Sequence, residues 1–406
     1  MKPAQLNVGV VSGGEILGLK AIAPMWDKTT GVRLNLIEYP YPTLYEKMVT
    51  AFQSNAATFD VVMLDDPWMP KFGAEGWLQP LDQAPFNMKP DPDIFPIVYA
   101  LGSWPPPTGP VPPGEGSKAR HILAITLVGN VQIFMYRKDL ESAPATYDQV
   151  LANATKANNP GKQFYGYAIR GAKGNPIVAD WLPILMAFGG RIFDDNWNVV
   201  LKSDASVAAL KYLVVSLKGV AQPGADTTDA ADRSRLLATG HALQSSVWPA
   251  EASDIVLNPK VSQQVNNMGF VVLPAGPSGK HMPLMGNWLL AIPKGAKQQD
   301  WSYKFIAWAT SKEVQGPYAS AGGIPSRKSI LTDATLNQKY PFFKAMADSL
   351  AAPPFWRPRT SEWSAVESII GTHANAALAG TETAEVAIDK AASEISQHMK
   401  EAGYIK

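Results

Sequence analysis

The chain has 406 residues, 46% hydrophobic and 17% charged, and its 36 Lys and Arg against 35 Asp and Glu leave a formal charge of +1. At about 150 residues per domain, this length predicts two or three domains with cores that need no metal or disulfide for stability. The balanced charge disfavours a nucleic-acid-binding protein. The absence of cysteine excludes thiol catalysis, iron–sulfur clusters, cysteine zinc sites and disulfides.

The sequence contains no targeting or membrane segment that we recognise. No run of 18 apolar residues occurs, so we expect no transmembrane helix. The first strand pattern begins at Leu6 without a preceding signal-peptide pattern. Both a cytoplasmic protein and a mature exported protein fit this start, and the sequence alone slightly favours the cytoplasm.

The first 65 residues alternate between strand and helix patterns. Apolar strands are predicted at Leu6–Val11, Val32–Glu38 and Phe59–Leu64. Helices are predicted at Glu15–Thr30, which has an apolar face, and from the capping box Thr43–Glu46 to Asn55. This order is typical of a doubly wound α/β fold with a parallel sheet.

The remaining chain contains a second α/β pattern, at about 130–270, and a helical end. Trp104–Gly116 holds six prolines and is predicted to be an extended surface segment. We predict strands at Ile122–Val128, Val131–Tyr136, Tyr165–Arg170, Ala242–Val247 and Trp288–Ile292. We predict helices at Thr146–Ala157, Pro176–Phe188, Val207–Leu217, Ala230–Ala238, Lys297–Thr310, Ser361–Leu378 and Glu385–Ala402.

Motifs of catalysis and of cofactor binding are missing. The five histidines are scattered without metal-ligand spacing, so we expect no metal site. Ser12–Glu15 follows the first strand but lacks the glycine patterns of dinucleotide and ATP sites, and no GxSxG motif occurs. We therefore expect no cofactor and no enzyme activity. A carbohydrate hydrolase or lyase stays a rival hypothesis for which the sequence offers no signature.

Aromatic and acidic residues at the ends of predicted elements indicate a sugar or polyol site. Asp65 and Asp66 follow the third strand, where open α/β sheets bind ligands. Five of the 12 tryptophans lie beside Asp, Pro, Gly or Asn at predicted element ends or in loops, where a ring can stack on a sugar: Trp68, Trp181, Trp248, Trp288 and Trp363. Arg357 can donate to the hydroxyls or to an acidic group of a ligand, or it can pair with an acidic residue across domains.

Several segments in succession resemble the carbohydrate-binding solute-binding proteins of ATP-binding cassette (ABC) importers, the group that includes maltose-binding protein. They include FDVVMLDDPWMPKFGAEGWLQPLD (59–82), VQIFMYRKDL (131–140), GNWLLAIPKGAK (286–297) and RPRTSEWSAV (357–366). The resemblance implies an α/β, two-lobed periplasmic binding protein fold. Each lobe is then a sheet flanked by helices, and a multi-strand hinge joins the lobes around a ligand cleft. The implied N-terminal lobe comprises 1–127 plus 284–328, and the C-terminal lobe 128–283 plus 329–406.

The resemblance also implies ligand-binding residues, function and location. The implied ligand-binding residues are Glu15, Tyr41, Asp66, Trp68, Asn130, Trp181, Trp248, Asn287, Trp288, Arg357 and Trp363. Trp181 is expected to open a helix, and the proline-rich segment departs from the maltose-type pattern. The expected protein is a periplasmic monomer that binds a small carbohydrate, polyol or sugar derivative, closes by a hinge and delivers its ligand to a membrane permease. A polyamine or an opine-like compound is the alternative ligand.

Overall fold

Two units of the chain are each built from segments that are distant in sequence. In the computed structural model, which describes residues 2–351 and 355–405, unit 1 comprises Met1–Asn130, Gly286–Tyr340 and Arg359–Ser361. Unit 2 comprises Val131–Met285, Pro341–Pro358 and Glu362–Lys406. The sequence-based lobe boundaries differ from these units chiefly at 329–340, which belongs to unit 1. Ser329 anchors the start of this segment by donating from its amide and hydroxyl to Asp93.

A five-stranded sheet forms the centre of unit 1, in the order β2-β1-β3-β10-β6. Its strands are β1 (Gln5–Val11), β2 (Arg33–Tyr39), β3 (Val61–Asp65), β6 (Ala124–Val128) and β10 (Trp288–Ala291). Strand β1 is parallel to β2 and β3, which confirms the predicted α/β opening, whereas β10 is antiparallel to β3 and β6. The antiparallel strand brings the start of β10 beside the end of β3, because Trp288 is paired with Asp65.

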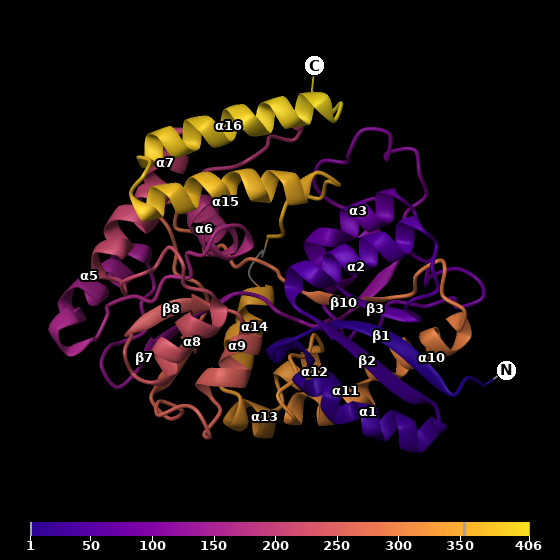
Figure 1. Cartoon of the computed structure of the whole chain (residues 1–406). Helices are drawn as coiled ribbons and strands as arrows, with labels where there is room; N and C mark the ends of the chain where they lie inside the picture. Colours follow the sequence, from indigo (N-terminus) through magenta and orange to yellow (C-terminus); the bar gives the residue numbers. More distant parts are fainter. Residues whose placement is uncertain (1, 352–354, 406) are drawn as a thin grey trace. The chain divides into compact units, whose positions relative to one another are not determined.

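Helices cover both faces of this sheet, with α2 and α3 on one side and α1 and α11 on the other (Figure 1). The helices of unit 1 are α1 (Leu17–Thr30), α2 (Tyr41–Gln53), α3 (Met69–Ala74), α4 (Pro96–Leu101), α10 (Gln299–Ala309), α11 (Lys312–Ser320), α12 (Lys328–Leu331) and α13 (Ala334–Lys339). Two short 3-10 helices, η1 (Gly14–Ile16) and η2 (Asp66–Trp68), follow β1 and β3. The sequence thus placed the start of α1 too early, because 14–16 forms η1.

The predicted capping box at Thr43 is wrong, because α2 begins two residues earlier at Tyr41. Pro42 lies in the first turn, where its missing N–H costs no helical hydrogen bond. The amide of Leu44 donates to the carbonyl of Pro40 at 2.9 Å, so the helical bonding already includes Pro40.

The proline-rich segment connects the short strands β4 (Ser103–Trp104) and β5 (His121–Ile122) and itself contains no helix, as predicted. Side chains hold it in place: the indole of Trp104 donates to Glu115 at 2.8 Å, and Arg120 donates to the carbonyl of Pro105 at 2.9 Å. Trp104 and Glu115 are buried, so the segment is only partly a surface feature.

Unit 2 contains a three-stranded antiparallel sheet, β8-β7-β9. Its strands are β7 (Ile133–Arg137), β8 (Gln244–Val247) and β9 (Met268–Val271). The strand predicted at Tyr165–Arg170 is wrong, because this segment forms only isolated bridges. Its amides change partner from residue to residue: Tyr167 donates to Val220, Ala168 to Gln244, and Ile169 to the side chain of Gln222.

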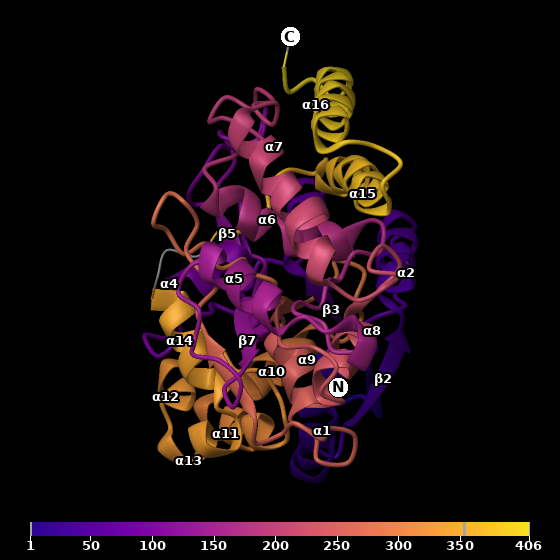
Figure 2. The same ribbon diagram turned by 90° about the vertical axis from the view of Figure 1, so that its left-hand side faces the viewer.

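Helices α5, α6, α7, α15 and α16 of unit 2 contribute to a large apolar cluster that includes Trp181, Trp248 and Trp363. The helices of this unit are α5 (Tyr147–Ala157), α6 (Asn175–Ala187), α7 (Asp204–Lys211), α8 (Ala230–Ala238), α9 (Pro249–Glu251), α14 (Phe342–Ala351), α15 (Trp363–Ala379) and α16 (Ala384–Glu401). Helices α15 and α16 lie side by side in both views (Figures 1 and 2). The remaining turns are 3-10 helices at Pro160–Lys162 and Lys218–Val220 and π-helices at Tyr212–Leu217 and Ala252–Val256. In the part of the chain that is described, no helix is both long and apolar enough to cross a bilayer.

Candidate ligand-binding residues

Three predicted aromatic residues meet in unit 1, where β3 ends and β10 begins. The ring centroids of Tyr41 and Trp68 lie 5.0 Å apart, and that of Trp288 lies 5.9 Å from Tyr41 and 5.6 Å from Trp68. Asp65 fixes the first of these rings, because Tyr41 donates its hydroxyl to Asp65 Oδ2 at 3.0 Å. Trp68 and Trp288 are buried and Tyr41 is half-buried. We call Tyr41, Trp68 and Trp288 the aromatic triad.

Next to this pair of strand ends, hydrogen bonds join Asp66, which follows β3, to Asn287, which precedes β10. Both residues are fully buried. The amide of Asp66 donates to the carbonyl of Asn287 at 3.0 Å, and the amide of Asn287 donates to Asp66 Oδ2 at 2.9 Å. Asn287 also donates from Nδ2 to Thr126 at 3.1 Å. Its Oδ1 has no hydrogen-bond partner among the described residues. Asp66 thus links two strand ends, whereas one acceptor of Asn287 is left without a partner in the described part of the chain.

The other two predicted residues of unit 1 lie beyond the ends of two further strands, β1 and β6. Glu15 is half-buried in η1, directly after β1. Asn130 is buried beyond the end of β6, and its carbonyl accepts from the amide of Gly286 at 2.9 Å. Both residues therefore lie in loops that follow strands of the unit 1 sheet.

In unit 2, Trp248 and Arg357 form a cation–π pair, with the guanidinium carbon 5.9 Å from the ring centroid. Trp248 precedes the short helix α9 directly after β8. Arg357 is 3% exposed, donates to the carbonyl of Met285 at 3.3 Å and lies 3.8 Å from Glu367. Arg357 therefore has an acidic neighbour within its own unit, whereas the expected alternative to a ligand contact was an acidic residue across domains.

Trp181 and Trp363 are each 1% exposed and belong to the apolar cluster of unit 2. Trp363 is the first residue of α15, but Trp181 lies inside α6, six residues after its start, so the expectation that Trp181 opens a helix is wrong. The helix pattern at Pro176–Phe188 predicts the start within one residue, so only the position implied by the resemblance is wrong. Neither indole N–H has an acceptor within residues 2–351 and 355–405. Two buried donors are therefore left for a ligand or for water.

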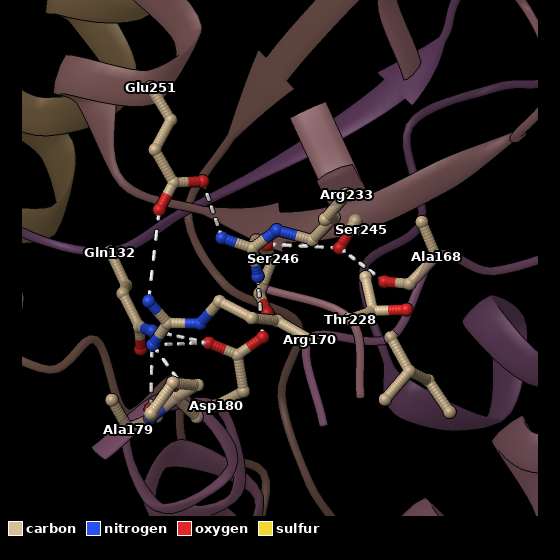
Figure 3. A network of polar contacts seen from close by, with 12 residues as sticks. Gln132, Ala168, Arg170, Ala179, Asp180, Thr228, Arg233, Ser245, Ser246 and Glu251 are labelled. Carbon is tan, nitrogen blue, oxygen red and sulfur yellow. Dashed lines mark hydrogen bonds and ion pairs between the residues drawn. The ribbon is translucent and has the colours of Figure 1, made fainter. Parts of the chain in front are cut away.

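A buried network of ion pairs in unit 2 was not predicted (Figure 3). Arg233 contacts Asp180 and Glu251, each at 2.5 Å, and Arg170 contacts Asp180 at 3.1 Å and Glu251 at 3.8 Å. Gln132 donates to the carbonyl of Ala179 at 3.2 Å beside them. We call Arg170, Asp180, Arg233 and Glu251 the four-charge network.

This network connects elements that carry two of the predicted tryptophans. Asp180 directly precedes Trp181 in α6, and Glu251 ends α9, which follows Trp248. Burial alone would lower the pKa of Arg233, but the charges of Asp180 and Glu251 outweigh burial, so this pKa lies above its usual value. No local pattern predicts the network, because its members are separated by up to 81 residues. In the described residues, no cluster of His, Cys, Asp or Glu could hold a metal ion.

The two α/β units with polar and aromatic residues at strand ends are those of a solute-binding protein. The chain belongs to the family of bacterial extracellular solute-binding proteins, whose model matches residues 13–316. The predicted resemblance is thereby confirmed at the level of the family, as is the α/β fold.

Individual relatives carry more specific names. The chain is 27% identical over 403 residues, covering 97% of it and 89% of the relative, to a probable amino-acid ABC transporter periplasmic-binding protein, y4oP, of Sinorhizobium fredii. It is 23% identical to the mannitol-binding protein of Pseudomonas aeruginosa, with 99% and 94% of the chains covered. A solute-binding protein of Agrobacterium radiobacter K84, crystallised with ribitol, matches with a TM-score of 0.85 and 25% identity over 98% of this chain and 99% of that one.

Proposed function

We propose that this protein is the ligand-binding component of an ABC importer and that it captures a small carbohydrate, most specifically an acyclic polyol. The family is that of extracellular solute-binding proteins. Two of the similar proteins bind, by their names, mannitol and ribitol, which are both linear chains of hydroxyl groups. The delivery partner is the membrane permease of the importer, and the protein acts in the periplasm as a monomer without catalysing a reaction.

The observation that supports a polyol is the set of buried polar atoms without partners. Asn287 Oδ1 is an acceptor, and the indole nitrogens of Trp181 and Trp363 are donors. An unsatisfied buried polar group costs about 1–3 kcal/mol. A hydroxyl group both donates and accepts, so a polyol can pair with either kind of atom. In unit 1, the rings of the aromatic triad also offer surface for the C–H groups of a polyol.

The test removes one donor and keeps the ring. Trp363→Phe deletes the indole N–H, and we expect its Kd for ribitol or mannitol to rise by about ten- to a hundredfold, because a hydrogen bond worth about 1–3 kcal/mol is lost. Isothermal titration calorimetry of the wild type and the variant measures this change. Titrations with maltose, an amino acid mixture and spermidine identify the ligand class.

Trp26→Phe is the matched control, because the Trp26 indole is also buried without a hydrogen-bond partner but lies in α1 in the core of unit 1. We expect this variant to bind polyol like the wild type. Wild-type protein that binds only amino acids or spermidine would refute the polyol assignment. Equal loss of affinity in both variants would show that Trp363 acts through stability alone.

A further inference from the structure

Arg359 is a buried cation beside Asp66, where β3 ends and β10 begins. Its Nη1 donates to the carbonyl of Asp66 at 2.9 Å and its Nη2 to the carbonyl of Leu101 at 2.6 Å. The same Nη1 lies 3.9 Å from Asp66 Oδ1, and the side chain is 3% exposed. Arg359 therefore binds the residue that starts η2 and, through it, the loop that carries Trp68.

The placement of this arginine in the chain is unusual. Arg359–Ser361 is a three-residue segment of unit 1 that lies in sequence between Pro358 and Glu362, both of unit 2. Arg357, only two residues earlier, makes its contacts with Met285, Glu367 and Trp248 in unit 2. The two arginines of the Arg-Pro-Arg sequence thus serve different units.

Burial of Arg359 has an energetic cost that its contacts only partly offset. Burial lowers the pKa of Arg359 to about 10, although the charge of Asp66 opposes this shift. A guanidinium spans two carbonyl groups because its planar fork carries several donors, which an ammonium group cannot reproduce. An arginine at this place is therefore suited to fix two backbone segments at once.

We propose that Arg359 is a positioning residue, which holds the hydrogen-bonded pair of Asp66 and Asn287 in the arrangement that the ligand needs. Asp66 links this guanidinium to the backbone of Asn287, and Trp288 follows directly in β10. The inference rests on the proposed function, since that function assigns ligand contact to Asn287 and the aromatic triad. Arg359 itself touches no ligand: it acts through the loop at 65–68.

The test compares Arg359→Met with Arg327→Met. Arg327 is the matched control because it is 5% exposed in the same unit, donates to the carbonyl of Thr310 and pairs with Asp91 and Asp93, outside the predicted ligand-binding residues. We expect both variants to lower Tm. Only Arg359→Met should raise the Kd for ribitol or mannitol, at least tenfold. Arg359→Lys, which keeps the charge but reaches one carbonyl, should show a smaller rise.

A measurement without ligand separates this inference from the proposed function. Hydrogen–deuterium exchange of the peptide covering 61–69 should be faster in Arg359→Met or Arg359→Lys than in Arg327→Met. If the wild type binds no polyol, the proposed function fails while this exchange still tests the positioning. Unchanged exchange, a Kd within twofold of the wild type, or an equal rise of Kd in Arg327→Met would overturn the inference. If Arg359→Met does not fold, the same comparisons are made with Arg359→Lys.

Discussion

The four-charge network yields the sharpest prediction about stability. Its two arginines and two carboxylates sum to zero charge, and their side chains are between 0% and 10% exposed. Arg233→Met keeps the volume of the side chain approximately but removes one positive charge. Asp180 and Glu251 then share Arg170 alone, and one negative charge remains uncompensated in the interior.

Breaking a buried ion pair by removing one partner costs about 3–5 kcal/mol, mainly because the remaining charge has lost its counter-charge. We expect this loss for Arg233→Met, since Arg233 is itself 0% exposed and has two carboxylates at 2.5 Å. The double variant Arg233→Met with Glu251→Gln restores neutrality, with Arg170 and Asp180 still paired at 3.1 Å. The free energy of unfolding that the double variant loses should therefore be smaller than the sum of the two single losses, by about 1–3 kcal/mol.

Urea unfolding at pH 7, followed by circular dichroism for all four proteins of the cycle, measures these free energies. The reasoning would be refuted by a loss below about 1 kcal/mol in Arg233→Met, against the cost expected for a broken buried pair. Additive losses in the double variant would equally contradict it, because they would show that the two charges do not interact.

Two further predictions concern single sites. Burial raises the pKa of Glu141 to about 7, so the folded state holds the proton more tightly than the unfolded state, and stability should fall as pH rises from about 4.5 to 7. Glu141→Gln should abolish this fall and gain about 1 kcal/mol at pH 8, after solvent screening of the half-buried group, and a Tm series over pH checks it. Gly102→Ala should lower Tm strongly, since its Cβ would lie 2.0 Å from the carbonyl oxygen of Ala124, whereas Gly116→Ala, with open space around it, should not.

Local patterns predicted the elements best where neighbouring residues decide the structure. Helix α8 agrees with its prediction at both ends, and β10 begins at Trp288 as expected. Half of the second predicted capping box is confirmed, because Thr146 caps α5 by accepting from the amide of Gln149, but the side chain of Gln149 accepts from the amide of Ala145 and not from that of Thr146. These helix ends, strand ends and caps are decided by residues close together in the sequence, so a local pattern can predict them.

Predictions failed where distant parts of the chain decide the structure. The apolar pattern at 165–170 is that of a strand, yet its amides find partners in three separate segments. The sequence predicts a ligand contact for Arg357 and no role for Arg359, although both are buried. The partners of Arg359, Asp66 and Leu101, are 293 and 258 residues away, so no local pattern distinguishes it.

The buried indole groups show why location decides whether an unpartnered atom indicates a ligand. The Trp26 N–H lacks an oxygen acceptor among the described residues. The ring centroids of Trp301, Phe305 and Trp308 lie 5.3–6.3 Å from that of Trp26. Aromatic faces can accept weakly from N–H groups. Trp181 and Trp363 have no such ring contact in the described parts of the chain. The core of unit 1 thus surrounds the Trp26 indole with aromatic rings, whereas the indoles of Trp181 and Trp363 in unit 2 have no such neighbours among the described residues. That difference is what a ligand rich in hydroxyl groups can use.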